Sequence, residues 1–335
     1  MNERFQPFTH TPGHYFLIPS STLVCRLFPS RIEIYDYQGI DPVLLKVIEF
    51  SWGPLKQFTA QCDLDKGYIQ VGGFTEDLRV IRYRIFATNE GWALRPIKGM
   101  ELHLSVCAEM KQIRPFERLH LGSYKKQRFA EMAMRLDMTE LLGLWYAFGQ
   151  LVDPMLPTAK TGTSLLGHLE RAIASKGDVL QALKNLFRAG FRSVFVPRLF
   201  DDEYHGFSEP IVSDSNTSPL VLLQQVAPLI RSLFFKEDAW QFSFLEQLPS
   251  EFHSGSLSQV TTTAGHSIAF CWSKHQIRTI HLHPHCDDEI QVVFQKEIRR
   301  ARVRQNKKDR GRTIENGARI TLTRAEPLLL DQFEK

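Results

Sequence analysis

Two hydrophobic periods alternate along the chain. Residues 14–110 contain short segments rich in β-branched and aromatic residues, separated by Pro, Gly, Asp or Asn, and this pattern predicts strands. Within residues 79–88, Ile81, Tyr83 and Ile85 occupy alternate positions, so this strand has one clearly apolar face. The regular spacing of such segments is typical of a β-sandwich.

The period becomes helical between residues 115 and 245. Apolar residues recur there at helical spacing and predict five helices. The first two helices are expected within residues 125–152, where Asp137 marks the start of the second. The third is expected to be capped by Ser164 or Thr163, the fourth to follow Gly177, and the fifth to have Pro219 near its start. Gly177 and Gly190 are stop signals for the third and fourth helices, and Pro228 is expected to kink the fifth.

Residues 256–335 return to strand patterns. Just before them, Pro249 and Gly255 precede an apolar/polar alternation, which we interpret as the exit from the helical part. The order β, α, β predicts an α+β fold in three parts. The expected parts are an N-terminal β-sandwich over residues 1–112, a helical domain over 113–247 and a C-terminal β-domain over 248–335.

The composition is that of an ordinary globular protein, with 43% hydrophobic and 23% charged residues among 335. No apolar run reaches the roughly 18 residues needed to span a bilayer, and the N-terminal residues show no signal-peptide pattern. The five cysteines are widely spaced and odd in number, which favours reduced thiols. We therefore expect a cytoplasmic protein without a membrane partner.

The net charge of +4 is concentrated in one run. Residues 299–312 hold eight Lys or Arg and one Asp, so the rest of the chain carries a net charge of −3. The run lacks the interleaved aromatic residues that stack on bases, and we interpret it as an exposed, mobile basic loop. We accordingly expect only weak nucleic-acid binding at physiological salt.

Two β segments resemble parts of glycoside hydrolases with an (α/α)6 toroid, the inverting α-L-fucosidase family among them. In that family a Leu-Asp-Leu-type element leads into a strand, a turn and an Arg-Tyr-Arg-type strand. The residues at matching positions here are Asp63, Leu64, Asp65, Tyr83, Arg84, Phe86 and Ala87. Past its helices the family has a Leu-Pro turn, two glycines and an apolar strand that ends in Trp. The residues at those positions are Phe244, Leu245, Leu248, Pro249, Gly255, Gly265 and Trp272.

This resemblance implies a helical toroid between two β-domains and a carbohydrate-related function. A complete (α/α)6 toroid has more helices than residues 113–247 predict, so the resemblance implies a reduced toroid. The Trp- and Asn-rich catalytic stretches of the family have no counterpart in this chain. No catalytic residue is therefore carried over from the family.

Residues 196–207 form the predicted ligand site. Asp202 and Glu203 are the candidate catalytic pair, because glycoside hydrolysis needs two carboxyl groups and adjacent like charges raise the pKa of one of them. The candidate substrate-binding residues are Trp145, Arg198, Asp201, Tyr204 and His205. The alternative is a solvated acidic loop in which Arg198 pairs with a neighbouring acid.

Three further motifs predict no chemistry. In residues 281–289 (HLHPHCDDE), Pro284 and the doubled acid fit a strand end and turn better than a zinc site, and no second cluster supports a metal. Residues 123–126 (SYKK) and 160–162 (KTG) lie too close together for a serine acyl-transfer site. No glycine-rich phosphate loop is present. We predict no metal and no cofactor.

Two functional classes therefore stay open. The first is a carbohydrate-related protein with a glycoside-hydrolase-like scaffold, either a glycan-acting enzyme or a non-catalytic glycan-binding relative, whose partner is a carbohydrate ligand. The second is a non-enzymatic interaction protein that uses the basic loop or the face of the sandwich. Convergent carboxylates in a concave pocket would favour the enzyme.

Overall fold

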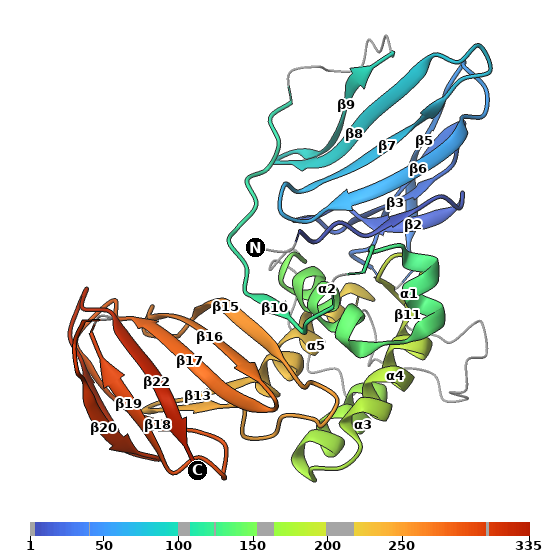
Figure 1. The fold of residues 1–335 in the computed structure, drawn as a ribbon. Coiled ribbons are helices and arrows are strands. Elements are labelled where there is room, and N and C mark those ends of the chain that lie inside the picture. Colours follow the sequence, from blue (N-terminus) through green and yellow to red (C-terminus); the bar gives the residue numbers. More distant parts are fainter. Residues whose placement is uncertain are drawn as a thin grey trace.

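The computed structural model describes residues 4–39, 41–99, 108–123, 125–152, 164–198, 218–305 and 308–335. It has an α+β fold, in which a helical part lies between two β-rich parts (Figure 1). One apolar core contains residues of all three parts, for example Ile34, Leu142 and Phe270. Among the described residues, every helix is too short or too polar to cross a lipid bilayer.

The N-terminal part is a β-sandwich of two antiparallel sheets. Their strand orders are β1-β6-β7-β8-β9 and β2-β3-β4-β5. The strands are β1 (Phe8–Thr9), β2 (His14–Leu17), β3 (Leu23–Leu27), β4 (Arg31–Asp36), β5 (Val43–Glu49), β6 (Lys56–Asp63), β7 (Tyr68–Phe74), β8 (Val80–Thr88) and β9 (Gly91–Lys98). The sheets pack through their apolar faces, where the rings of Phe50 and Tyr83 lie 5.4 Å apart and the Cys25 and Cys62 thiols are buried.

Strand β5 is an edge strand with unusual exposure. It pairs only with β4, and its side chains Val43, Leu44, Leu45 and Val47 are exposed. Strand β9 lies at the edge of the other sheet and contains Pro96. Proline is tolerated on an edge strand, whose outer N–H groups need no partner within the sheet.

The helical part contains the five predicted helices among its described residues. They are α1 (Phe129–Arg135), α2 (Met138–Gln150), α3 (Ser164–Ala174), α4 (Val179–Gly190) and α5 (Leu220–Ser232). Asp137 caps α2 by accepting a hydrogen bond from the Thr139 N–H, and Asp178 caps α4 in the same way from the Gln181 N–H. Pro228 lies inside α5, as the sequence indicates.

The middle of the chain also contains strands that the helical period does not predict. They are β10 (Arg118–His120), β11 (Phe191–Arg192), β12 (Val196–Pro197), β13 (Phe235–Asp238) and β14 (Gln241–Phe244). Strand β10 pairs with β15, and the β13–β14 hairpin joins a sheet with β18 and β21. Phe242 and Phe244 occupy alternate positions of β14 with the buried Ser243 between them, and an apolar spacing of two is a strand period.

The C-terminal part packs a seven-stranded sheet on a four-stranded one, with the orders β10-β15-β16-β17-β22-β19-β20 and β13-β14-β18-β21. The remaining strands are β15 (Gly255–Thr261), β16 (Ser267–Ser273), β17 (Gln276–His283), β18 (Asp288–Val293), β19 (Arg300–Arg304), β20 (Arg312–Glu315), β21 (Arg319–Leu322) and β22 (Leu328–Glu334). Phe244 and Phe270 meet between the sheets with ring centroids 5.3 Å apart.

The turn expected at residues 245–260 leads into strand β15, which starts at Gly255. A side chain at this position would meet the His120 carbonyl oxygen at 2.4 Å and the Trp272 ring at 2.5 Å. Glycine therefore lets β10 and the Trp272 ring approach the start of β15 closely. The sequence correctly predicts a transition into strands here.

The basic run differs from the expected mobile loop. Residues Arg300–Arg304 form strand β19 inside the seven-stranded sheet, and Ala301 and Val303 are buried. The arginines on the other face pair with acids of β22. Arg300 lies 2.5 Å from Glu334, and Arg302 lies 2.8 Å from Asp331. The Arg-Ala-Arg-Val-Arg alternation is a strand period, which a count of charges alone conceals.

Candidate functional site

The predicted acidic site cannot be placed. Asp201, Asp202, Glu203, Tyr204 and His205 all lie outside the described residues. Their catalytic and binding roles therefore stay predictions. The structure does describe the other two predicted site residues, Trp145 and Arg198.

Trp145 lies in the core. Its side chain is fully buried, and its ring meets the rings of Phe187 and Phe191 edge-on at centroid distances of 5.6 and 4.9 Å. In this arrangement the indole has no exposed face on which a sugar could stack. The structure thus gives Trp145 a packing role at the carboxyl end of α4.

Arg198 is also buried, close to the same helix end. Its Nε donates to the Ala189 carbonyl oxygen at 2.8 Å, and one terminal nitrogen donates to the Arg188 carbonyl oxygen at 2.9 Å. A guanidinium in this position satisfies the last carbonyl groups of α4 and interacts favourably with the negative end of the helix dipole. These contacts connect the Arg198 side chain to the end of α4.

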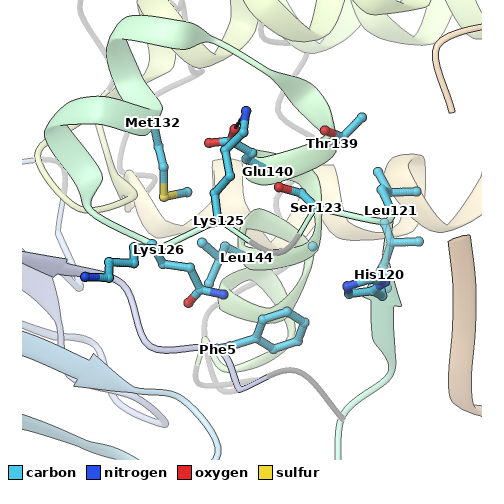
Figure 2. A pocket seen from close by; sticks show the side chains of 13 residues that line it. Phe5, His120, Leu121, Ser123, Lys125, Lys126, Met132, Thr139, Glu140 and Leu144 are labelled. Carbon is cyan, nitrogen blue, oxygen red and sulfur yellow. Dashed lines mark hydrogen bonds and ion pairs between the residues drawn. The ribbon is translucent and has the colours of Figure 1, made fainter. Parts of the chain in front are cut away.

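A small cavity lies between α1, α2 and the segment after β10 (Figure 2). Its volume is about 20 Å³, and Ser123, Lys125 and Glu140 line it. Lys125 lies 2.6 Å from Glu140, and Arg135 lies 2.5 Å from the same carboxylate. The cavity has room for about one water molecule, and the lysine is held in an ion pair. This geometry offers no substrate site around Ser123.

The histidine-rich segment 281–289 forms a strand end and a turn. His266 is fully buried, accepts a hydrogen bond at Nδ1 from the His285 N–H at 3.1 Å and approaches Asp288 with Nε2 at 3.1 Å. The accepting Nδ1 leaves the proton on Nε2, which donates to the carboxylate. No group of three or more metal-ligating side chains occurs among the described residues.

The outer face of the five-stranded sheet carries a row of polar side chains. Four of these side chains stand directly opposite one another across β6, β7, β8 and β9: Gln61, Gln70, Arg84 and Arg95. On β1, the apolar Phe8 stands opposite Gln61 at the end of the row. Residues that pair in this way point to the same face of a sheet. The inward neighbours on these strands are buried apolar residues, so the polar row faces away from the sandwich core.

A groove of about 320 Å³ crosses this outer face over β6, β7 and β8. The residues that line it include Gln57, Thr59, Gln61, Gln70, Gly72 and Arg82. Gly72 stands between Thr59 and Arg82 in the ladder, and its missing side chain deepens the groove. The amide groups of Gln57 and Gln61 make no hydrogen bond within the described part of the chain, so they are available to a ligand.

Two arginines beside the groove are held in fixed positions. The Arg84 guanidinium lies over the Tyr68 ring at 4.1 Å, and its Nε donates to Gln70 at 3.3 Å. The Arg95 guanidinium lies over the Phe86 ring at 4.9 Å. Stacking on a ring restricts the rotation of a guanidinium and leaves other N–H groups for hydrogen bonding. The outer face thus combines amides, an open groove and ordered cations.

The sequence contains a signal for this face. In residues 79–88 the alternation identifies the apolar, inward side, while Arg82 and Arg84 mark the opposite side. The partners Gln61 and Gln70 become neighbours only through strand pairing, which the alternation alone does not specify. Comparison with protein-family models and with curated protein sequences finds no match.

Proposed function

We propose that this protein binds carbohydrate on the outer face of its five-stranded sheet. The observation that carries the proposal is the groove of about 320 Å³ lined by Gln57, Gln61, Gln70 and Arg82 around Gly72. Each glutamine amide supplies donors and an acceptor in one plane. Neighbouring sugar hydroxyls present donors and acceptors together, so planar amides and a guanidinium match them in pairs.

The wider proposal includes the scaffold and the compartment. The order β, α, β and the five described helices support a reduced toroid between two β-domains, as in the inverting α-L-fucosidase-like enzymes. The free thiols Cys25 and Cys62, both buried, support a cytoplasmic location. Hydrolysis by Asp202 and Glu203 is the enzymatic form of the proposal, and a screen of glycosides for turnover tests it separately.

Glycan binding is tested with a substitution that places a side chain in the groove. Gly72→Leu should weaken glycan binding by about tenfold or more, a loss of at least about 1.4 kcal/mol, because the new side chain would occupy the space beside Gln70. Gly167→Leu is the matched control, since no atom lies within 4 Å of an added Cβ at that position. Oligosaccharide arrays followed by titration calorimetry provide the measurement, and circular dichroism verifies folding.

Two results would contradict the proposal. The first is a parent chain that binds no oligosaccharide, and the second is Gly72→Leu binding as tightly as Gly167→Leu. Either would favour the interaction protein, for which the exposed edge strand β5 is the supporting observation. The basic run supports that alternative less, because its strand arginines Arg300 and Arg302 already pair with acids.

A further inference from the structure

Two like-charged pairs stand side by side on the outer face. Arg82 is directly opposite Lys98, and Arg84 is directly opposite Arg95. We call these four residues the basic quartet. Neighbouring strands lie about 4.8 Å apart, and the register shifts between the two pairs, where β9 has one extra residue. The four cations therefore lie close together on two adjacent strands.

The basic quartet has no neutralising partner within the described residues. No carboxylate in that part of the chain lies within ion-pair distance of any of the four. Like charges directly opposite each other on adjacent strands destabilise a sheet. An anion bound over the four cations would reduce this repulsion. The electrostatic free energy of the face therefore falls when an anionic ligand binds.

The quartet can form directed hydrogen bonds to an acidic group as well as attract it by charge. The Arg84 and Arg95 side chains are ordered by the rings beneath them, and Arg82 and Lys98 are exposed. A pre-positioned guanidinium fork binds carboxylate or sulfate oxygens with little further loss of side-chain entropy. The outer face can therefore hold an acidic group beside the neutral groove.

We propose that the basic quartet binds carboxylate or sulfate groups of an acidic glycan whose sugar ring occupies the adjacent groove. This inference rests on the proposed carbohydrate binding and specifies the class of glycan. Arg82 belongs to both features, since it lines the groove and is one member of the quartet. A glycan with an acidic substituent would thus contact both features at once.

A glycan fits this face better than a single-stranded nucleic acid. Nucleic acids need aromatic platforms for their bases, as well as cations for their phosphates. The rings beneath the quartet, Tyr68 and Phe86, are buried and already covered by Arg84 and Arg95. Phe74 is the one aromatic residue among those that line the groove beside them, so the groove offers a single ring rather than a row of stacking platforms.

The test compares acidic and neutral polysaccharides with the full chain. The probes are heparin, its desulfated and carboxyl-reduced derivatives, and neutral dextran, each titrated at several salt concentrations. We expect heparin to bind at least about tenfold more tightly than dextran, and its affinity to fall with salt. The derivative that loses more affinity identifies which acidic group the quartet binds. Arg82→Gln and Arg84→Gln should each weaken heparin binding by about tenfold. Arg188→Gln, at an exposed site on α4, should not change it.

The outcomes separate the two proposals. Equal binding of acidic and neutral glycans, still lost in Gly72→Leu, would overturn the quartet proposal and leave carbohydrate binding intact. Absence of binding to every glycan would overturn both. Arg82→Gln and Arg84→Gln proteins that melt like the parent and bind heparin unchanged would also overturn the quartet proposal. If an oligodeoxythymidylate with the same net charge as the heparin probe bound equally tightly, the proposed ligand would be a nucleic acid instead of a glycan.

Discussion

The two β-sandwiches of this molecule each place arginines at alternate positions of one strand, and they differ in what stands opposite. Strand β19 puts Arg300 and Arg302 opposite two acids of β22. Strand β8 puts Arg82 and Arg84 opposite the cations of β9. The first arrangement neutralises itself, whereas the second keeps its charge for a ligand. A cluster of unneutralised cations therefore lies away from the most basic run of the chain.

This contrast shows that charge density along a sequence is a poor guide to a binding surface. Residues 299–312 contain eight cations, yet the strand portion of the run is part of a folded sheet with ion pairs. Residues 79–88 contain only three arginines, one of them paired with Asp77. The partner across the strand decides whether a charge is satisfied, and that partner depends on register.

The largest expected effect comes from breaking the neutralised strand. Asp331 accepts ion pairs from both Arg302 and Arg304, and its side chain is only 13% exposed. Asp331→Asn should lower the free energy of unfolding by about 1–2 kcal/mol, because two largely covered guanidinium groups lose their charged partner. Urea unfolding measures the change.

Glu334→Gln is the control for that measurement. Its pair with Arg300 is about half exposed, with side chains 61% and 52% accessible, and exposed ion pairs contribute little. The control should be destabilised by less than about 0.5 kcal/mol. Equal decreases in the free energy of unfolding of the two variants would show that the burial of Asp331 does not strengthen its ion pairs.

Acid should weaken the same strand selectively. The hydrogen bond from Arg302, together with the positive charges of Arg302 and Arg304, lowers the pKa of the Asp331 carboxyl. A depressed folded pKa adds stability above the unfolded value of about 3.9, and that stability is lost as pH falls through the folded pKa. Melting temperatures from pH 6 downward should therefore fall more steeply for the parent than for Asp331→Asn. Parallel curves would contradict this linkage.

Local patterns predict the main elements of the fold but not the pairs that make the outer face. Asp137 can be recognised as a helix start because capping acts within one turn. Strand β19 is concealed because its apolar residues, Ala301 and Val303, are few and small among arginines. Gln61 and Gln70 meet only across strands, so their shared face follows from pairing rather than from either segment alone.

The predicted acidic site is a separate case. The sequence predicts Trp145 and Arg198 as its partners from their chemical type, an aromatic ring for stacking and a cation for pairing. Both side chains are buried: the Trp145 ring packs on Phe187 and Phe191, and the Arg198 guanidinium donates to carbonyl groups at the end of α4. Residue type alone does not specify whether a side chain faces the core or a ligand.

The smallest expected change in stability gives the most direct test of the central claim, that the charge of the basic quartet is not neutralised until an anionic glycan binds. Lys98→Glu would place an acid opposite Arg82 and so give β8 the arrangement that β19 already has. Calorimetry with and without heparin should show a melting temperature about 1 °C higher and heparin binding at least about tenfold weaker. Lys98→Gln should show a smaller change in both. A Lys98→Glu protein that is no more stable than the parent and binds heparin equally well would contradict the claim.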